Sequence, residues 1–129
     1  MIKYLIPIIL VINCASNSQI NLSNPHTQLV NWKDAEKLCK TKGERLPTIE
    51  ELEIAFKDGE IYEAYTPMAM VGFSNKIDRY WSSTPAEDGK YYSLVASAEE
   101  YSAFREMIGK KYPIKSNSFS GVRCIKNIN

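Results

Sequence analysis

Cysteine is the residue type in this sequence with the widest reactive chemistry, and the chain has three cysteines, at positions 14, 39 and 124. A thiolate can act as a nucleophile or bind a soft metal ion, and two thiols can pair as a disulfide. An odd count leaves at least one cysteine outside any set of intramolecular disulfides. The surroundings of Cys14 give that residue a chemistry of its own.

Cys14 follows a short apolar segment that is typical of an export signal. The apolar run over residues 4–12 is too short to cross about 30 Å of hydrocarbon as a helix, but it matches the core of a secretory signal peptide. The sequence VINCA at 11–15 resembles a bacterial lipobox, although Asn13 stands where Gly, Ala or Ser is usual. We therefore expect residues 1–13 to be a lipoprotein signal peptide and Cys14 to carry the lipid. The alternative is an ordinary signal peptide or an uncleaved anchor.

Lipidation of Cys14 would leave Cys39 and Cys124 as a pair. An oxidising compartment outside the cytoplasm would favour a disulfide between them. This bond would close a loop of about 85 residues and contribute roughly 4 kcal/mol to stability in the chain-entropy description. One premise, export with lipidation, thus accounts for all three cysteines.

The other reactive side chains show no spacing that supports catalysis. His26, the one histidine, lies in a polar segment without neighbouring ligand residues, so we expect a solvated loop residue. The sequence has no nucleophile elbow, no His-rich metal spacing, no glycine-rich phosphate loop and no calcium-lectin triplet. Sixteen basic residues face fifteen acidic ones without a basic stripe, which argues against nucleic-acid binding. We therefore expect no catalytic residue, no metal and no cofactor.

Two helices are predicted before residue 60. The first extends from Trp32 to about Lys42, with Asn31 as its cap and Cys39 on its buried face. Gly43 ends it. The second begins at Thr48, where Thr48 and Glu51 form a capping box, and ends at Asp58-Gly59, with Ile49, Leu52, Ala55 and Phe56 as its buried face.

Strands are predicted in the second half of the chain. Residues 78–84 and 91–95 form a hairpin with a turn at 85–89, and residues 121–126 alternate between buried and exposed positions, so that Val122 and Cys124 share a face. Residues 60–78 have no clean period and indicate an irregular loop, and residues 98–107 fit either a short helix or a loop. The polar segment 14–28 indicates a tether, which leaves 29–127 as the domain.

Four short motifs occur in a fixed order along the domain. They are W-x-x-A-x-x-x-C at 32–39, R-L-P-T-x-x-E-L at 45–52, Y-W-S-S-T at 80–84 and V-R-C-I at 122–125. This order resembles the Lcl C-terminal domain family of bacterial exported proteins, which is related to the sulfatase-modifying-factor fold, a variation on the C-type lectin-like fold. The resemblance implies an α+β domain in which two helices pack on small antiparallel sheets with long irregular loops. The chain departs from the family in its shortened segment before the R-L-P-T motif and in having only Leu29-Val30 for a strand before the first helix.

The resemblance also implies roles for individual residues in the fold. It implies that Cys39 and Cys124 pair and that Arg45 anchors a backbone carbonyl or a carboxylate. The hydroxyls of residues 82–84 would bind loop backbone. The core would include Trp32, Leu46, Trp81 and Val122.

For function, the resemblance and the anchor favour an adhesin-like envelope module that binds a protein or a glycan. We expect it at the outer membrane or cell surface, held to the membrane by its lipid. The candidate surface comprises the loops 60–78 and 96–120, which carry the aromatic residues Tyr62, Tyr65, Phe73, Tyr101, Phe104 and Tyr112. Two alternatives are an accessory envelope lipoprotein without an external ligand, and an enzyme of the formylglycine-generating type, which would need a reactive cysteine pair.

Overall fold

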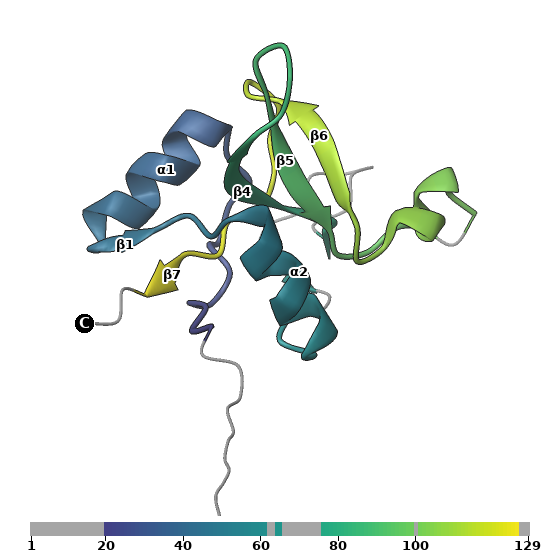
Figure 1. Cartoon of the computed structure of the whole chain (residues 1–129), viewed down its shortest axis with the longest axis horizontal. Coiled ribbons are helices and arrows are strands. Elements are labelled where there is room, and N and C mark those ends of the chain that lie inside the picture. Colours follow the sequence, from purple (N-terminus) through teal and green to yellow (C-terminus); the bar gives the residue numbers. More distant parts are fainter. Residues whose placement is uncertain (1–19, 62–63, 66–75, 100, 127–129) are drawn as a thin grey trace, which may run out of the picture.

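A three-stranded antiparallel sheet lies at the centre of the described structure, in the order β4 (Arg79–Pro85), β5 (Lys90–Val95), β6 (Lys111–Lys115). The computed structural model describes residues 20–61, 64–65, 76–99 and 101–126. Two further antiparallel pairs form: β1 (Glu44–Arg45) with β7 (Ile125–Lys126), which lie side by side in Figure 1, and β2 (Ala64–Tyr65) with β3 (Lys76–Ile77). No helix in the described ranges is long and apolar enough to cross a membrane. In chain order the elements are α1 (Trp32–Thr41), β1 (Glu44–Arg45), α2 (Ile49–Lys57), β2 (Ala64–Tyr65), β3 (Lys76–Ile77), β4 (Arg79–Pro85), β5 (Lys90–Val95), the 3₁₀ helix η2 (Ala103–Met107), β6 (Lys111–Lys115) and β7 (Ile125–Lys126).

Helix α1 confirms the predicted first helix and places Cys39 on its buried face. The Asn31 side chain accepts a hydrogen bond from the Asp34 amide at 2.9 Å, which satisfies one of the free N–H groups of the first turn. Gly43 follows the helix with a φ of 73°, a left-handed conformation that glycine adopts without a steric penalty. Helix α1 lies against β1 and β4, so its buried face is directed toward the sheets.

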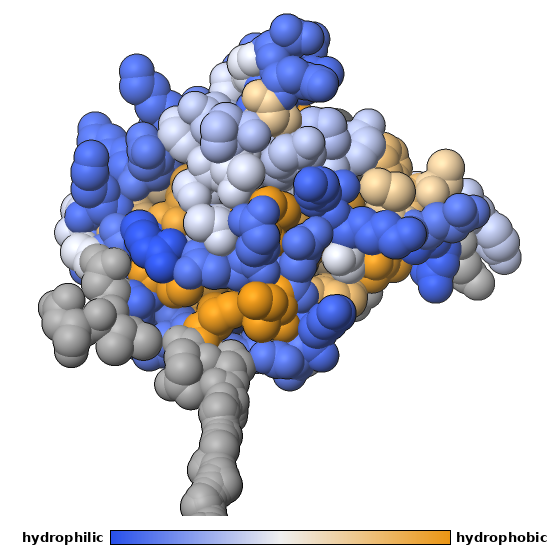
Figure 2. Space-filling view, in the orientation of Figure 1, coloured by the Kyte–Doolittle hydropathy of each residue, from blue (hydrophilic) through white to orange (hydrophobic). Residues whose placement is uncertain are grey.

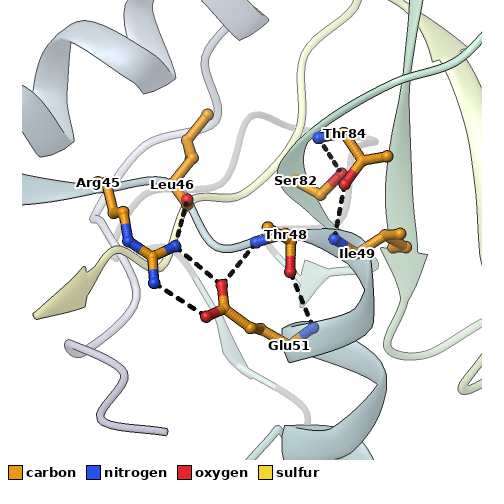
Figure 3. A network of polar contacts seen from close by, with 7 residues as sticks. All are labelled: Arg45, Leu46, Thr48, Ile49, Glu51, Ser82 and Thr84. Carbon is orange, nitrogen blue, oxygen red and sulfur yellow. Dashed lines mark hydrogen bonds and ion pairs between the residues drawn. The ribbon is translucent and has the colours of Figure 1, made fainter.

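Helix α2 begins with the predicted capping box. The Thr48 hydroxyl accepts from the Glu51 amide at 3.2 Å, and the Glu51 carboxylate accepts from the Thr48 amide at 2.8 Å. Arg45 donates to both oxygens of the same carboxylate at 2.9 Å and to the Leu46 carbonyl at 3.4 Å (Figure 3). Arg45 therefore anchors both a carboxylate and a backbone carbonyl. Its hydrogen bonds hold the pKa of Glu51 below the ordinary value and raise the pKa of Arg45.

Side chains of β4 connect the start of α2 to the sheet. The Thr84 hydroxyl accepts from the Ile49 amide at 2.9 Å, and the Ser82 hydroxyl donates to the Tyr92 carbonyl at 2.7 Å (Figure 3 shows the first of these contacts). The Ser83 amide donates to the Pro47 carbonyl at 2.8 Å. The expected binding of loop backbone by these hydroxyls thus holds for Ser82 and Thr84, whereas Ser83 contributes its backbone amide.

Buried apolar side chains gather in two clusters. One lies under α2 and includes Ile49, Leu52, Ala55, Ile61, Ile77, Tyr80, Leu94 and Ala96, with Phe56 partly buried against it. The other surrounds the cysteines and includes Ala35, Cys39, Leu46, Trp81, Val122 and Cys124. Leu46, Trp81 and Val122 are core residues as the resemblance implies, while Trp32 packs at the edge of the second cluster and is only partly buried.

The segment 20–26 runs beside the last described residues, which differs from the tether expected over 14–28. Leu22 forms an antiparallel bridge with Ile125, and the amides of Ser23 and His26 donate to the carbonyls of Cys124 and Val122 at 2.8 and 2.9 Å. A polar, Asn-rich composition did not predict these contacts because they use backbone groups. Residues 14–19 lie outside the described residues.

The last segment does not alternate as predicted. Residues 120–125 are all buried, and only residues 125–126 form a strand, β7. Arg123, which alternation would expose, is 6% exposed and donates to the carbonyls of Ser23 and Glu60 at 2.8 and 2.6 Å. Burial on both faces arises because segment 20–26 covers the side that the pattern assigned to solvent.

The two segments predicted as loops contain short regular elements. Within 60–78, β2 and β3 pair in antiparallel register, although most of this segment lies outside the described residues. Within 96–120, η2 resolves the ambiguity at 98–107, and β6 pairs with β5 over five positions, Lys90 with Lys115 to Leu94 with Lys111. Pro113 and the lysines at the two ends of β6 make this strand difficult to predict from the sequence, because proline and lysine are depleted in central strands and tolerated at sheet edges.

Candidate functional site

The two described cysteines form a disulfide. Cys39 and Cys124 are bonded with their Cα atoms 5.4 Å apart, and both are buried. The predicted pair is therefore confirmed, and neither sulfur is a free thiol. Cys14, the predicted lipidation site, lies outside the described residues.

The predicted aromatic set separates into three groups. Tyr62 and Phe73 lie outside the described residues, and Tyr65 is placed only by its backbone in β2. Phe104 and Tyr112 contact one another with ring centroids 5.1 Å apart in an edge-to-face arrangement. Tyr101 is 95% exposed. The structure therefore brings Phe104 and Tyr112 together and leaves Tyr101 projecting alone among the described members.

Tyr112 lies in β6. Tyr101 and Phe104 belong to one projection before it, residues 96–110 between β5 and β6, which we call the excursion. It extends from the sheet on the side away from α1 and carries η2 (Figure 1). Its base is closed by two backbone hydrogen bonds, from the Val95 amide to the Lys110 carbonyl at 3.0 Å and from the Gly109 amide to the Val95 carbonyl at 2.7 Å. None of the residues of η2 is buried, and the excursion presents a mixture of hydrophilic and weakly hydrophobic residues (Figure 2).

Polar and aromatic contacts fix the interior of the excursion. The Ser102 hydroxyl accepts from the Phe104 amide at 3.0 Å and caps η2, and the Ser102 amide donates to the Glu99 carbonyl at 3.0 Å. The Arg79 guanidinium lies 5.6 Å from the centroid of the Phe104 ring, within the range of a cation–π contact. Phe104 and Tyr112 thus serve as supports, and Tyr101 is held at the start of a constrained turn.

A second aromatic surface was missed by the sequence analysis. Trp32 and Tyr91 stack with ring centroids 3.7 Å apart and an interplanar angle of 7°, and the Trp32 indole N–H donates to the Ser82 carbonyl at 2.9 Å. They border an open hollow of about 330 Å³ whose other lining residues are polar: Asn31, Lys33, Glu36, Ser116 and Asn117. The indole of Trp32 is therefore fixed at the edge of the core. This position is close to the interior one that the family resemblance implied.

The fold and these surfaces can be compared with known domains. Residues 12–107 match the sulfatase-modifying factor enzyme 1-like domain, which is about three quarters of the chain. The chain belongs to this family. The match confirms the resemblance drawn from the motif order, and with it an α+β fold of the C-type lectin-like class. A comparison with curated proteins gives no match.

Membership of the sulfatase-modifying factor family leaves the chemistry of this chain open, since the family includes an enzyme. Within the described ranges, no three His, Cys, Asp or Glu side chains come together in a way that could hold a metal ion. The expectation that the chain has no catalytic residue stays a prediction.

His26 was predicted to be a solvated loop residue, and its surroundings in the structure differ from that prediction. It is partly buried beside residues 22–27, and its backbone is bonded to Val122. Burial and, secondly, the charge of Lys42 lower the pKa of its imidazole below the ordinary value of 6.5. His26 is therefore expected to be neutral at pH 7.

Proposed function

We propose that this member of the sulfatase-modifying factor family is a lipid-anchored module of the bacterial envelope that binds an extracellular protein or glycan through the excursion. The observation that carries the proposal is Tyr101, a large aromatic side chain that is 95% exposed on a projecting segment. The other aromatic residue of that segment, Phe104, packs against Tyr112 of β6. Isolated exposed apolar residues are common on proteins, but tyrosines on loops supply much of the contact area in antibody-type binding surfaces.

The chemistry of tyrosine suits either class of ligand. Its ring can stack on a sugar or fill a protein pocket, and its hydroxyl can donate or accept a hydrogen bond. Because the base of the excursion is closed by backbone bonds and Phe104 is held by Tyr112 and Arg79, binding would order little of the surrounding chain. A smaller ordering cost leaves more of the contact energy for affinity.

The anchor part of the proposal rests on the lipobox at Cys14. An extended chain spans at most about 3.5 Å per residue, so residues 14–20 could place Ile20 within about 20 Å of a membrane surface. The excursion lies away from residues 20–26 in the folded domain (Figure 1). An anchored chain would therefore present the excursion away from the point of attachment.

The binding experiment compares the full chain with Tyr101→Ala on an array of bacterial and mammalian glycans and on immobilised extracellular-matrix proteins. Phe119→Ala is the matched control, because Phe119 is also an exposed aromatic residue, 64% exposed, and lies outside the excursion. We expect a signal that Tyr101→Ala reduces about tenfold and Phe119→Ala leaves unchanged, as for loss of an interface anchor. Equal loss in both variants, or no signal above an unrelated lipoprotein, would reject the proposal.

The anchor is tested separately by the intact mass of the protein from its native host. A mature chain that begins at Cys14 and carries acyl mass supports it, and an unprocessed chain contradicts it. Digestion of intact cells with protease then asks whether the domain is at the surface. Protection of the domain in intact cells would favour the accessory envelope role over the adhesin-like one.

A further inference from the structure

A hollow of about 420 Å³ lies beside residues 22–27, close to the first described residues of the chain. Its lining combines three parts of the chain that are distant in sequence: residues 22–27, Lys42 after α1, and Lys126 in β7. None of the residues assigned to the excursion takes part. The hollow is thus a separate surface from the one proposed to bind an extracellular ligand.

The lining is held in place by covalent and backbone contacts. The disulfide joins Cys39 to Cys124, so the chain positions shortly before Lys42 and Lys126 are directly bonded. The Lys126 amide donates to the Asn21 carbonyl at 3.0 Å, and the Lys42 amide donates to the Cys39 carbonyl at 3.0 Å. The two lysine backbones are therefore fixed relative to each other before any ligand arrives.

The electrostatic character of the lining is positive. Lys42 and Lys126 line the hollow, and no Asp or Glu does. Glu44 stands beside it, as the register partner of Lys126, and accepts a hydrogen bond from the Ser23 hydroxyl at 2.8 Å. The ion pair found among the described residues is Arg45 with Glu51, so Lys42 and Lys126 have no carboxylate partner in that part of the chain.

Neutral donors complete the lining. The Asn24 amide and the Thr27 hydroxyl border the hollow and make no hydrogen bond to another described side chain. Two ammonium groups with an amide and a hydroxyl are a donor set suited to a tetrahedral oxyanion, because each oxygen can accept from a different group. The depressed pKa of His26, caused first by burial and then by Lys42, is consistent with a site of positive potential.

We propose that this hollow binds a phosphate group, held by Lys42 and Lys126 with Asn24 and Thr27 as neutral donors. The phosphate could belong to a membrane lipid headgroup or to a soluble phosphate ester. The lipid source rests on the proposed anchoring at Cys14, which would place the hollow near a membrane surface. Binding of phosphate itself does not depend on the anchor.

His26 provides a direct reporter, because it is the one histidine in the sequence and gives a single set of imidazole NMR signals. In a titration of the full chain with inorganic phosphate at constant ionic strength, we expect these signals to shift and saturate. Bound phosphate adds negative charge, so the pKa of His26 is expected to rise. The charged groups that face His26 across the hollow are Lys42 and Lys126, with Glu44 at its side. A shift that chloride reproduces at equal ionic strength would overturn the proposal.

The lysines are tested by the double variant Lys42→Ala with Lys126→Ala. We expect phosphate affinity to fall by about tenfold or more, since a charge-assisted hydrogen bond contributes about that much or more to binding. Its matched control is Lys40→Ala with Lys57→Ala, which removes two exposed lysines from the last turns of α1 and α2 without touching the lining. The proposed roles of Lys42 and Lys126 are contradicted if their double variant keeps its phosphate affinity, or if both double variants lose phosphate affinity equally. Lys42→Ala alone should raise the pKa of His26 without phosphate, because it removes a neighbouring positive charge.

Vesicles distinguish the two sources of phosphate. Binding of the protein to phosphatidylglycerol vesicles is compared with its binding to neutral phosphatidylcholine vesicles. The same comparison is made for the variant that lacks Lys42 and Lys126. Binding that favours phosphatidylglycerol and is lost in the lysine variant but not in its control supports a headgroup ligand. Response to inorganic phosphate without that preference supports a soluble ester. If neither probe distinguishes the variant from wild type, the proposed phosphate site is wrong, whatever the mass of the mature chain shows about Cys14.

Discussion

The disulfide is enclosed by buried side chains, whereas in the excursion only residues 96–98 are buried among those that the structure describes. Around Cys39 and Cys124, α1, β1, β4 and β7 meet and enclose Trp81, whose indole N–H donates to the Val30 carbonyl at 2.8 Å. In the excursion, a few hydrogen bonds and one aromatic contact determine the conformation. From this difference we expect the disulfide region to contribute more to stability than the excursion, which presents a solvent-exposed aromatic residue. Substitutions in the two regions should therefore separate stability from binding.

The largest expected loss follows removal of the disulfide. Replacing both Cys39 and Cys124 with Ala should lower the free energy of unfolding by about 2–5 kcal/mol, because the bond closes a long loop in the unfolded chain. Chemical denaturation of the variant and of wild type, each without reductant, measures the change. A loss below about 1 kcal/mol would mean that packing alone secures this region.

A smaller loss is expected for Gly121→Ala, which borders the other buried cluster, under α2. A Cβ atom at this position would collide with the Ile77 side chain and approach the Arg79 carbonyl to 3.0 Å. Overpacking of this kind costs about 1–3 kcal/mol, since backbone must move to relieve it. Thermal unfolding followed by circular dichroism would record the change, with Gly89→Ala as a comparison. That position is open but has a φ of 71°, so its cost is backbone strain without overpacking.

Glu51 connects the R-L-P-T segment to α2 and makes stability depend on pH. Its pKa is lowered in the folded state, first by the hydrogen bond from Arg45, so the contribution is present above the ordinary value of 4.5 and is lost as pH falls through the folded pKa. Glu51→Gln should cost about 1 kcal/mol at pH 7, because the pair is partly exposed to solvent, and the cost should shrink as pH falls through the lowered pKa of Glu51. Urea denaturation at several pH values tests this, and a difference that stays constant with pH would show that the charge of Glu51 does not carry the effect.

The smallest effect on stability is expected for Tyr101→Ala. Its side chain is almost fully exposed, so the free energy of unfolding should change by no more than about 0.5 kcal/mol. Phe104→Ala should cost more, about 1 kcal/mol, because it removes the contacts with Tyr112 and Arg79. Denaturation curves of the two variants under identical conditions provide the comparison. If Tyr101→Ala proves the more destabilising, the tyrosine supports the excursion and is not a free binding group.

Much of the buried region was predictable from sequence because local rules govern it. Helix caps at Asn31 and Thr48, the helical spacing of Cys39 and the hairpin of β4 and β5 follow from short-range patterns. The motif order then connected Cys39 to Cys124 across the chain. These features depend on neighbours within a few residues, or on a family whose pairing is known.

The excursion and the last segment were harder to predict for identifiable reasons. Strand β6 contains Pro113 and two lysines, a composition that also fits a loop, and it is recognisable only by its pairing with β5. The burial of Arg123 depends on the segment 20–26, which covers it through backbone contacts that carry no side-chain pattern. The stack of Trp32 on Tyr91 and the hollow beside Lys42 and Lys126 are likewise products of tertiary structure.

The pairing of residues 20–26 with the last described segment determines how the domain would respond to mechanical force. A pull on the N-terminal side reaches Leu22 and Ser23 first and strains their bonds to Ile125 and Cys124. Once tension passes Cys39, it divides between the polypeptide and the covalent S–S link to Cys124. The excursion lies within that closed loop, so it is connected to the pulling point by two covalent routes. Under load, the chain could therefore extend only in the stretch before Cys39 and within the loop that the disulfide closes.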